Sequence, residues 1–443
     1  MNIIYMHTHD SGRYMEPYGH NVPTPNLMGL ARQSTLFRHC YCAGPTCSPS
    51  RAALLTGTPP HANGMIGLAH RGFRLNDHGM HLSSYLRSLG YETALCGVQH
   101  EAPSADMLGY DTILTSGTPA KSTCGRDMAN AYAAAEYIKN YSGRGKNFFL
   151  SFGMFSTHRE YPYDKADIMG IRQDYIMPPH VMYDIQTNRE DMAGYHASAK
   201  TADDCAGIVM DALADSGIED DTVVVFTTDH GIAFPKMKCN LYDTGIGVAL
   251  MVKYPNNPTK GTANDFLVSH IDVFPTLCEL CGIKKPNWLV GKSFCGILSG
   301  EKNEINDEIF AEVTYHAAYE PMRCVRTARY KLIRRYDVHN SWVPANTDDG
   351  KSKRFLTAAG IASRPMAGEM LFDLHLDPLE RENVVGESGY SSVYNDLSAR
   401  LCGWMERTGD PLAAANRRVP APVGAKVNKL GCFDPTDGED DFE

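Results

Sequence analysis

The sequence has no long hydrophobic run and no excess of positive charge. Its 443 residues carry a formal net charge of -10, and no stretch approaches the roughly 20 apolar residues that a membrane-spanning helix needs. A general nucleic-acid binder would need basic surface to meet phosphates, so we expect neither a membrane nor a nucleic-acid partner. A small anionic substrate stays compatible with the sequence, because a few local cations can bind an anion within an acidic protein.

A secretion signal is also missing from the start of the sequence. Residues 1–6 contain neither the basic segment nor the small-residue cleavage site of a signal peptide. We therefore expect a cytoplasmic protein. The 13 cysteines are an odd number, and in that compartment reduced thiols are the default.

The composition and the order of the predicted elements are those of a globular α/β protein. Hydrophobic residues make up 43% of the chain and charged residues 21%, and the length suits one large domain plus a smaller one. Strands alternating with helices predict a large mixed, mostly parallel sheet sandwiched by helices. The predicted strands span residues 2–6, 92–96, 147–152, 222–227 and 248–252, and the predicted helices span 23–32, 82–89 and 195–216.

The pattern changes after about residue 305. Residues 324–326, 329–333 and 371–374 read as short antiparallel strands, which predicts a small C-terminal α+β subdomain. We therefore divide the chain into an α/β domain at 1–304, a subdomain at 305–412 and a polar, acidic tail at 413–443. The end of that tail, 434–443, has the composition of a solvated or disordered segment.

One short segment combines a cysteine with a helix start. Pro49 suits the first turn of a helix and Gly57 suits its end, so Cys47 lies at or just before the helix N-terminus. Free N–H groups and the helix dipole favour an anion there and lower the pKa of a thiol. Arg51, one turn further, adds a positive charge. At this level an ordinary buried cysteine beside a helix start is an equally open interpretation.

The run Cys47-x-Pro49-Ser50-Arg51, followed by Leu54-Leu55-Thr56-Gly57, resembles the signature of the sulfatase family, within the alkaline phosphatase superfamily. In that family the cysteine is converted to formylglycine by a formylglycine-generating enzyme, and the hydrated aldehyde is the nucleophile. The resemblance covers most of the chain, and runs 63–65 and 234–242 are most similar to the N-sulfoglucosamine sulfohydrolase branch. It implies an alkaline phosphatase-like fold and a metal-dependent hydrolase of a sulfate ester or sulfamate, with a sulfated saccharide as substrate.

The resemblance also implies one divalent metal ion. Asp10 and Asp229 each follow a predicted strand, in loops that match the family's metal loops, and Cys47 becomes the metal-bound nucleophile. Calcium is the usual metal of the family. His230, however, stands where calcium sulfatases carry asparagine, and imidazole is a better ligand for manganese or zinc. His9 replaces the first of two consecutive aspartates and is either a ligand or a neighbour of one.

Further catalytic residues are implied by position within the family pattern. His100 and His158 match two active-site histidines, and either could protonate the leaving group. Lys238 matches a cation that holds a sulfate oxygen, although a solvated surface lysine is the alternative. Val98 occupies the place of a family lysine, so one sulfate-binding charge is missing or comes from elsewhere.

Two other functions fit parts of the sequence. A phosphonate monoester or phosphodiester hydrolase of the same superfamily is favoured by His230 and Val98, because an Asp-His pair resembles that branch. A non-catalytic binding protein that kept the fold is disfavoured by the four intact site residues, Cys47, Arg51, Asp10 and Asp229.

Overall fold

A large sheet forms the centre of the molecule. The computed structural model describes residues 1–114, 122–141, 145–337, 339–414 and 418–433, and its largest sheet has the strand order β10-β2-β9-β7-β1-β6-β4-β5. The pairs that involve β9 are antiparallel and the other neighbouring pairs are parallel, which confirms the predicted mixed sheet. The strands are β1 (Asn2–Thr8), β2 (Thr35–Phe37), β4 (Glu92–Gly97), β5 (Thr112–Leu114), β6 (Phe148–Gly153), β7 (Thr222–Thr228), β9 (Leu250–Lys253) and β10 (Thr262–Asn264).

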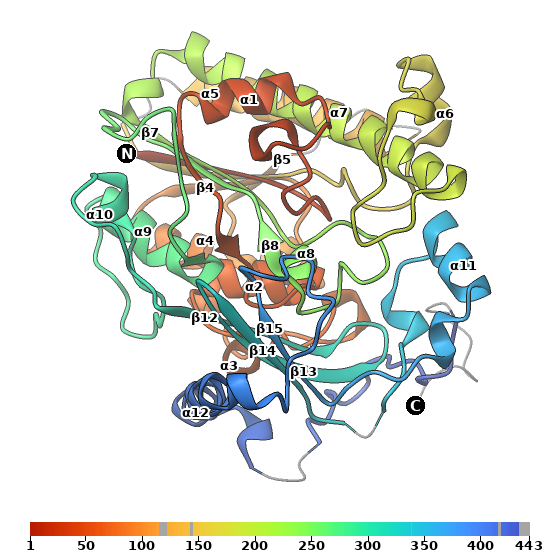
Figure 1. Ribbon diagram of the computed structural model, residues 1–443. Coiled ribbons are helices and arrows are strands. Elements are labelled where there is room, and N and C mark those ends of the chain that lie inside the picture. The colour runs from red at the N-terminus through yellow and green to blue at the C-terminus, as the bar shows by residue number, and fades with distance from the viewer. Residues whose placement is uncertain (115–121, 142–144, 338, 415–417, 434–443) are drawn as a thin grey trace.

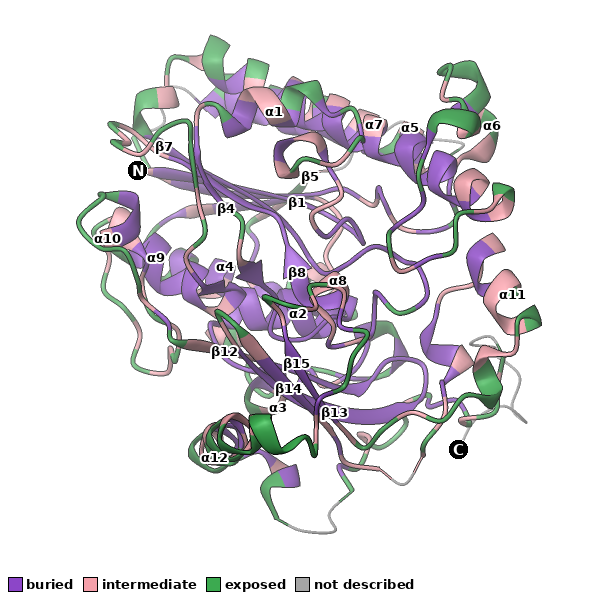
Figure 2. Ribbon diagram, viewed as in Figure 1, coloured by how far each residue is buried: buried purple, intermediate pink, exposed green. Residues whose placement is uncertain are grey.

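Both faces of this sheet are buried (Figure 2). Along β1, Ile3 and Tyr5 belong to one hydrophobic core, while Ile4 and Met6 belong to the other. Successive side chains of a strand point to opposite faces, so a continuous apolar run is what a doubly covered strand requires. This explains why the run at residues 2–6 shows no polar alternation.

Helices cover the two faces in separate groups (Figure 1). Helices α1 (Pro25–Ala31), α5 (Thr123–Tyr141) and α7 (Gln186–Ser216) lie together on one face. Helices α2 (Cys47–Thr56), α4 (Leu82–Ser88) and α9 (Val273–Leu280) lie on the other face, between the large sheet and the C-terminal sheet. The shorter helices are α3 (Pro60–Asn63), α6 (Tyr163–Ile168), α8 (Asp243–Ile246), α10 (Cys295–Leu298) and α11 (Lys351–Ala358).

Helix α7 begins nine residues earlier than the sequence predicted. Its first turns bury polar side chains in place of an apolar stripe. Asp191 accepts two hydrogen bonds from Arg159, at 2.7 and 2.8 Å. A helix that packs through a buried ion pair lacks the hydrophobic periodicity by which helices are recognised.

The predicted strand at residues 248–252 is two strands, because the chain there divides between two sheets. Residues Gly247–Val248 form β8, which pairs with β3 (Cys40–Tyr41) in a small sheet of order β11-β3-β8, and β11 is Val268–Ser269. The large sheet resumes only at β9. Between them, the N–H of Ala249 donates to the carbonyl of Gly12 at 3.0 Å, and this interrupts the ladder.

An antiparallel sheet forms the C-terminal part, as the sequence predicted, but it has four strands, and the first of them was not predicted. Its core is continuous with that of the large sheet, since Ile3, Val325 and Leu371 belong to one cluster, and α12 (Ser391–Thr408) packs against β13 and β14. The strands are β12 (Glu308–Tyr315), β13 (Tyr319–Thr327), β14 (Tyr330–Arg335) and β15 (Glu369–Asp373).

The described residues beyond α12 return to the body of the protein. In the segment 418–433, the N–H of Lys426 donates to the carbonyl of Arg71 at 2.8 Å, and the N–H of Asn428 donates to the carbonyl of Ala317 at 2.8 Å. The segment therefore lies against two loops of the protein. Residues 434–443, predicted to be solvated or disordered, lie outside the described residues.

All 13 cysteines are free thiols. Within the described ranges, no helix has both the length and the apolar character to cross a bilayer.

Candidate active site

The predicted site residues gather at one edge of the large sheet. Strands β7, β1, β6 and β4 are neighbours and run parallel, so their carboxyl ends meet at the same edge, where open α/β sheets place ligands. Each of these ends leads into a loop that carries predicted site residues. They are His9 and Asp10 after β1, Asp229 and His230 after β7, His158 after β6, and His100 after β4.

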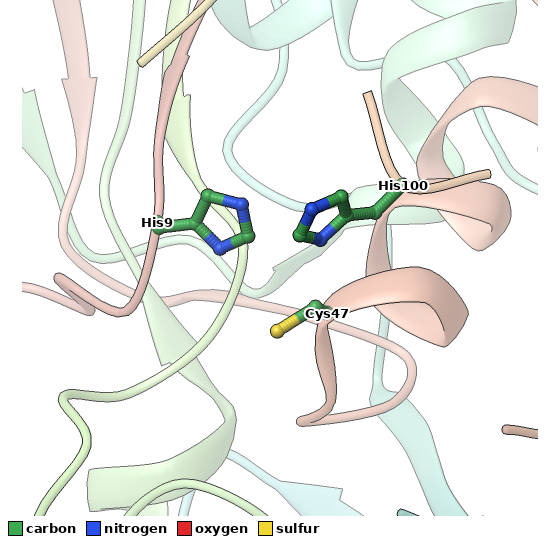
Figure 3. A group of neighbouring side chains, drawn as sticks. All are labelled: His9, Cys47 and His100. Carbon is green, nitrogen blue, oxygen red and sulfur yellow. The ribbon is translucent and has the colours of Figure 1, made fainter. Parts of the chain in front are cut away.

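The start of α2 faces this edge. Cys47 is the first residue of the helix, and Gly57 caps its end with a left-handed φ of 67°, as the sequence predicted. The thiol sulfur Sγ lies 3.4 Å from Nε2 of His230 and 3.9 Å from Oδ1 of Asp10. Figure 3 shows Cys47 at the helix start, directed toward the space beside the rings of His9 and His100.

Two buried carboxylates and two buried imidazoles lie beside the thiol. The N–H of Asp10 donates to Oδ1 of Asp229 at 2.8 Å, which ties the two loops together. Nε2 of His230 lies 3.3 Å from Oδ1 of Asp10 and 3.6 Å from Oδ2 of Asp229. Nδ1 of His9 lies 3.2 Å from that same oxygen of Asp229.

The local chain is built to bring these groups close. Asp10 has a positive φ of 37°, which aspartate tolerates better than most residues. Gly231 admits no side chain, because a Cβ there would lie 1.9 Å from the carbonyl oxygen of Thr244. The Asp229-His230-Gly231 run therefore needs its glycine for a close approach of the backbone.

This cluster fits a divalent cation. His9 is fully buried; its Nδ1 faces the carboxylate of Asp229 at 3.2 Å, and its Nε2 has no hydrogen-bond partner among the described residues. Ligand atoms of His9, Asp10, Cys47 and Asp229 all lie within 4.8 Å of one another. A buried ring nitrogen without a hydrogen bond is costly, and a metal ion bound to the imidazole and to the carboxylates would remove that cost.

Charge in the cluster also favours a cation. Burial and Arg51 oppose a charge on His9, but Asp229 and Asp10 outweigh them and raise the pKa of His9 to about 10. Burial opposes a charge on His230 as well, and the same two carboxylates raise its pKa to about 9. Two carboxylates in a buried site thus hold positive charge there, as protons when no metal is bound.

The electrostatic surroundings of Cys47 favour an anion. Burial works against a charged thiol, yet Lys238 and His230, with hydrogen bonds from His100 and His158, hold the pKa of Cys47 well below its ordinary value. A negatively charged group at this helix start is therefore stabilised.

Arg51 hydrogen-bonds one of the candidate metal ligands. Its Nη2 donates to Oδ2 of Asp229 at 3.0 Å and to the carbonyl of Thr8 at 3.2 Å, and its Nη1 contacts Nδ1 of His7. The guanidinium is 1% exposed. These bonds orient Asp229, so Arg51 positions the candidate ligand. His7 had no signal in the sequence, because it occupies an ordinary strand position.

Lys238 is buried, which excludes the solvated surface lysine. Its Nζ donates to Oδ2 of Asp10 at 2.9 Å and to Oδ2 of Asp348 at 2.7 Å. Burial opposes the charge, but these two carboxylates hold the pKa of Lys238 well above its usual range. Asp348 was missed by the sequence analysis, because nothing in its neighbourhood in the chain marks it.

The pKa values of the two candidate proton donors are shifted in opposite directions. Burial opposes a charge on His158, but Asp10 outweighs it and raises its pKa, and Nδ1 of His158 hydrogen-bonds the carbonyl of Arg159. Burial lowers the pKa of His100 to about 4. Val98 stands at the place of the family lysine. Its N–H donates to the carbonyl oxygen of Gly153 at 2.9 Å, just beyond the end of β4.

A cavity of about 340 Å³ opens onto Cys47, within the size range of small-molecule sites. Several of its side chains come from parts of the chain that the sequence analysis did not connect with the site. The lining residues are Cys47, Leu68, His70, Arg71, His100, His158, Lys238, His316, Ala317, Asp348 and Lys426.

Two family models match the chain. A model described as Sulfatase matches residues 2–283, and a model described as N-sulphoglucosamine sulphohydrolase, C-terminal, matches residues 231–350. The first covers the strands and loops that build the cluster around Cys47.

Known proteins resemble the chain over nearly its whole length. The N-sulphoglucosamine sulphohydrolase of Homo sapiens is 26% identical over 97% of this chain and 93% of its own length. An ulvan-active sulfatase of Formosa agariphila is 27% identical over 97% of this chain and 85% of its own. The solved structure of a protein in complex with its substrate D-glucosamine-2-N,6-O-disulfate has the same fold, with a TM-score of 0.74, 17% identity, and coverage of 92% of this chain and 98% of that one.

Proposed function

Because the chain belongs to the sulfatase family and is therefore a sulfuric ester hydrolase, we propose that it cleaves a small sulfated saccharide through a formylglycine formed from Cys47. The observation that carries this proposal is the position of Cys47. It begins α2 at the cavity, beside two carboxylates and two imidazoles that fit a cation.

The hydrated aldehyde would supply two hydroxyls, one that takes the sulfuryl group and one whose collapse to the aldehyde expels sulfate. A plain thiol or hydroxyl has no second hydroxyl for that step. The chain's own residues support the transfer. Lys238 lies in the cavity wall, where its ammonium can hold a sulfuryl oxygen. His100 and His158 also line the cavity. His158, whose pKa is raised, is the better placed of the two to protonate the leaving oxygen or nitrogen, because the lowered pKa of His100 favours its neutral form.

His9, Asp10, Asp229 and His230 would hold one divalent metal, which supplies Lewis acidity at the nucleophile and at the sulfuryl oxygens. Calcium prefers an all-oxygen shell. Two imidazoles with two carboxylates suit manganese or zinc better, so we propose one of these metals for this chain. Arg51 supports the set through its bond to Asp229.

The saccharide substrate is supported by the relatives. One is named for N-sulphoglucosamine and another for ulvan, and the cavity has room for a small sugar. The phosphonate alternative is less well supported, because the two relatives named above are a sulfatase and a sulfohydrolase.

The test is a paired measurement of modification and activity. The protein is produced with and without a formylglycine-generating enzyme, and the mass of the peptide that contains Cys47 is measured by mass spectrometry. Conversion lowers the peptide mass by about 18 Da, and we expect sulfate release from sulfated glucosamines to rise in proportion. Cys47→Ala is the inactive control. Full activity in protein that keeps the thiol, or greater turnover of phenyl phosphonate than of aryl sulfate, would refute the proposal.

A further inference from the structure

A buried arginine directly follows the candidate proton donor in the chain. Arg159 is 9% exposed and lies next to His158, in the loop between β6 and α6. It is not among the described residues that line the cavity, and the proposed reaction gives it no role. Its guanidinium nevertheless meets α7 and two further segments, each of which carries a residue of the cavity wall.

The carboxylate partner of Arg159 is Asp191 in α7. Nη1 of Arg159 donates to Oδ1 of Asp191 at 2.7 Å, and Nη2 donates to Oδ2 at 2.8 Å. Asp191 is completely buried, and α7 is 31 residues long. A bidentate pair between two planar groups fixes the orientation of the guanidinium as well as its position. Residue 159 is therefore anchored to a long helix.

Arg159 also binds the loop that follows β7. Its Nε donates to the carbonyl of Ala233 at 2.8 Å, and its Cζ lies 5.0 Å from the centre of the Phe234 ring. Lys238 belongs to the same loop, where its N–H donates to the carbonyl of Ile232 at 3.2 Å. The loop that carries the candidate sulfuryl-binding lysine is thus held against Arg159.

The segment before α11 packs on the same ion pair. Oδ2 of Asp191 accepts a hydrogen bond from the N–H of Ser352 at 3.1 Å. A Cβ at Gly350 would lie 2.3 Å from Nη1 of Arg159, so the backbone passes the guanidinium too closely for a side chain. Asp348, two residues earlier, lines the cavity. The ion pair therefore sets the position of this segment as well.

The carbonyl of Arg159 orients the ring of His158. Nδ1 of His158 hydrogen-bonds this carbonyl. Because a carbonyl only accepts, Nδ1 must carry a hydrogen, and Nε2 is the nitrogen left for the cavity. The direction of the ring thus depends on the backbone of residue 159, which the guanidinium of the same residue anchors to Asp191 and Ala233.

We propose that Arg159 is a positioning residue of the reaction. Its bonds to Asp191 and Ala233 hold the carbonyl that orients His158, so that Nε2 of His158 meets the leaving group while Lys238 holds the sulfuryl group. This inference rests on the proposed function, in which the leaving oxygen or nitrogen takes a proton from His158 as its bond to sulfur breaks.

The experiment compares two leaving groups. Arg159→Lys keeps a positive charge opposite Asp191, but an ammonium cannot reproduce the fork of bonds to both carboxylate oxygens and to Ala233. The converted enzyme is assayed with 4-nitrophenyl sulfate, whose phenolate leaves without a proton. It is also assayed with N-sulfoglucosamine or glucosamine 6-sulfate, whichever the unsubstituted enzyme hydrolyses faster, since these leaving groups need a proton.

We expect Arg159→Lys to lower kcat by about 10- to 100-fold for the sugar and by less than about threefold for the aryl sulfate, because general-acid catalysis contributes about 10²- to 10⁴-fold. Loosened packing by itself would slow both substrates alike. Circular dichroism and the metal content verify that the variant is folded and loaded.

A second comparison needs the sugar only. In the His158→Ala enzyme the proton donor is absent, so adding Arg159→Lys should change kcat by less than about twofold. Arg189→Lys is the matched control, because Arg189 lies on α7 and pairs with the exposed Asp184 at 2.6 Å. It should leave kcat for both substrates within about twofold.

Equal losses for the sugar and the aryl sulfate would overturn the positioning role. An Arg159→Lys effect of the same size with and without His158 would overturn it as well, and this comparison decides alone if the aryl sulfate is a poor substrate. Failure of the proposed function is seen separately, as absence of sulfate release by the converted, unsubstituted enzyme.

Discussion

Nζ of Lys238 lies between two carboxylates, 2.9 Å from Oδ2 of Asp10 and 2.7 Å from Oδ2 of Asp348. Asp10 comes from the first strand's loop, and Asp348 comes from the loop before α11. The lysine therefore joins the candidate metal cluster to the C-terminal part of the cavity, and its direction depends on both partners.

Asp348→Asn should lower kcat/KM for a sulfate ester by about 10- to 100-fold. A hydrogen bond to a charged group contributes about 1.5–3 kcal/mol, and its loss lets Lys238 turn toward Asp10. The metal content, measured by inductively coupled plasma mass spectrometry, should stay unchanged. Asp349→Asn is the control, since Asp349 pairs with the exposed Arg354, and it should keep activity within twofold. Equal activity of Asp348→Asn and the unsubstituted enzyme would contradict this role.

The metal cluster should select manganese or zinc over calcium. Protein dialysed against equal amounts of the three ions should retain one equivalent of manganese or zinc. A chelator should lower the unfolding temperature, and either of these ions should restore it, since a ligand at 100 times its Kd adds about 2.7 kcal/mol of stability.

His230→Asn provides the matched test of that selectivity. It replaces an imidazole with an amide oxygen, so calcium should gain in the same competition. Retention of calcium by the unsubstituted protein would show that the imidazoles are not ligands.

Arg323→Met should destabilise the fold by about 3–5 kcal/mol. Arg323 is completely buried, and its Nε lies 3.0 Å from Oε2 of Glu312 and 2.5 Å from Oδ2 of Asp410. Removal of the guanidinium takes its positive charge away from two buried carboxylates, and Glu312 then keeps only its hydrogen bonds with His61 among its described partners. Urea unfolding measures the change. Lys285→Met, which breaks the exposed pair with Glu279, should cost less than about 1 kcal/mol, and a similar cost for both variants would contradict the expectation.

The same ion pair should make the free energy of unfolding depend on pH in the acidic range. Burial alone would raise the pKa of Asp410, but Arg323 outweighs burial and lowers it. A carboxylate with a lowered folded pKa contributes stability that is complete above the pKa of about 3.9 of an unfolded aspartate and is lost as the pH falls below it.

Asp410→Asn tests this sign. The variant should be less stable than the unsubstituted protein at pH 6, and the difference between their urea midpoints should shrink from pH 4 to pH 3. A difference that stays constant or grows on acidification would refute the argument.

Local sequence patterns predicted much of the fold because burial leaves a local trace. The apolar run at residues 2–6 indicated a strand, and the structure covers that strand on both faces. The strand patterns after residue 305 indicated the change to an antiparallel sheet. The patterns failed where packing was not apolar or not local. Helix α7 starts with a buried ion pair, and the run at residues 248–252 is shared between two sheets.

By itself, the sequence determined the helix start at Cys47 and the loops that carry Asp10 and Asp229, since a cap, a glycine or a strand end marks each of them locally. The tertiary structure decided the rest of the cavity. Asp348, His316 and Lys426 come from loops and a C-terminal segment far along the chain from Cys47. Their convergence depends on how the C-terminal sheet packs on the large one, and no periodicity within a segment specifies which distant segment it meets.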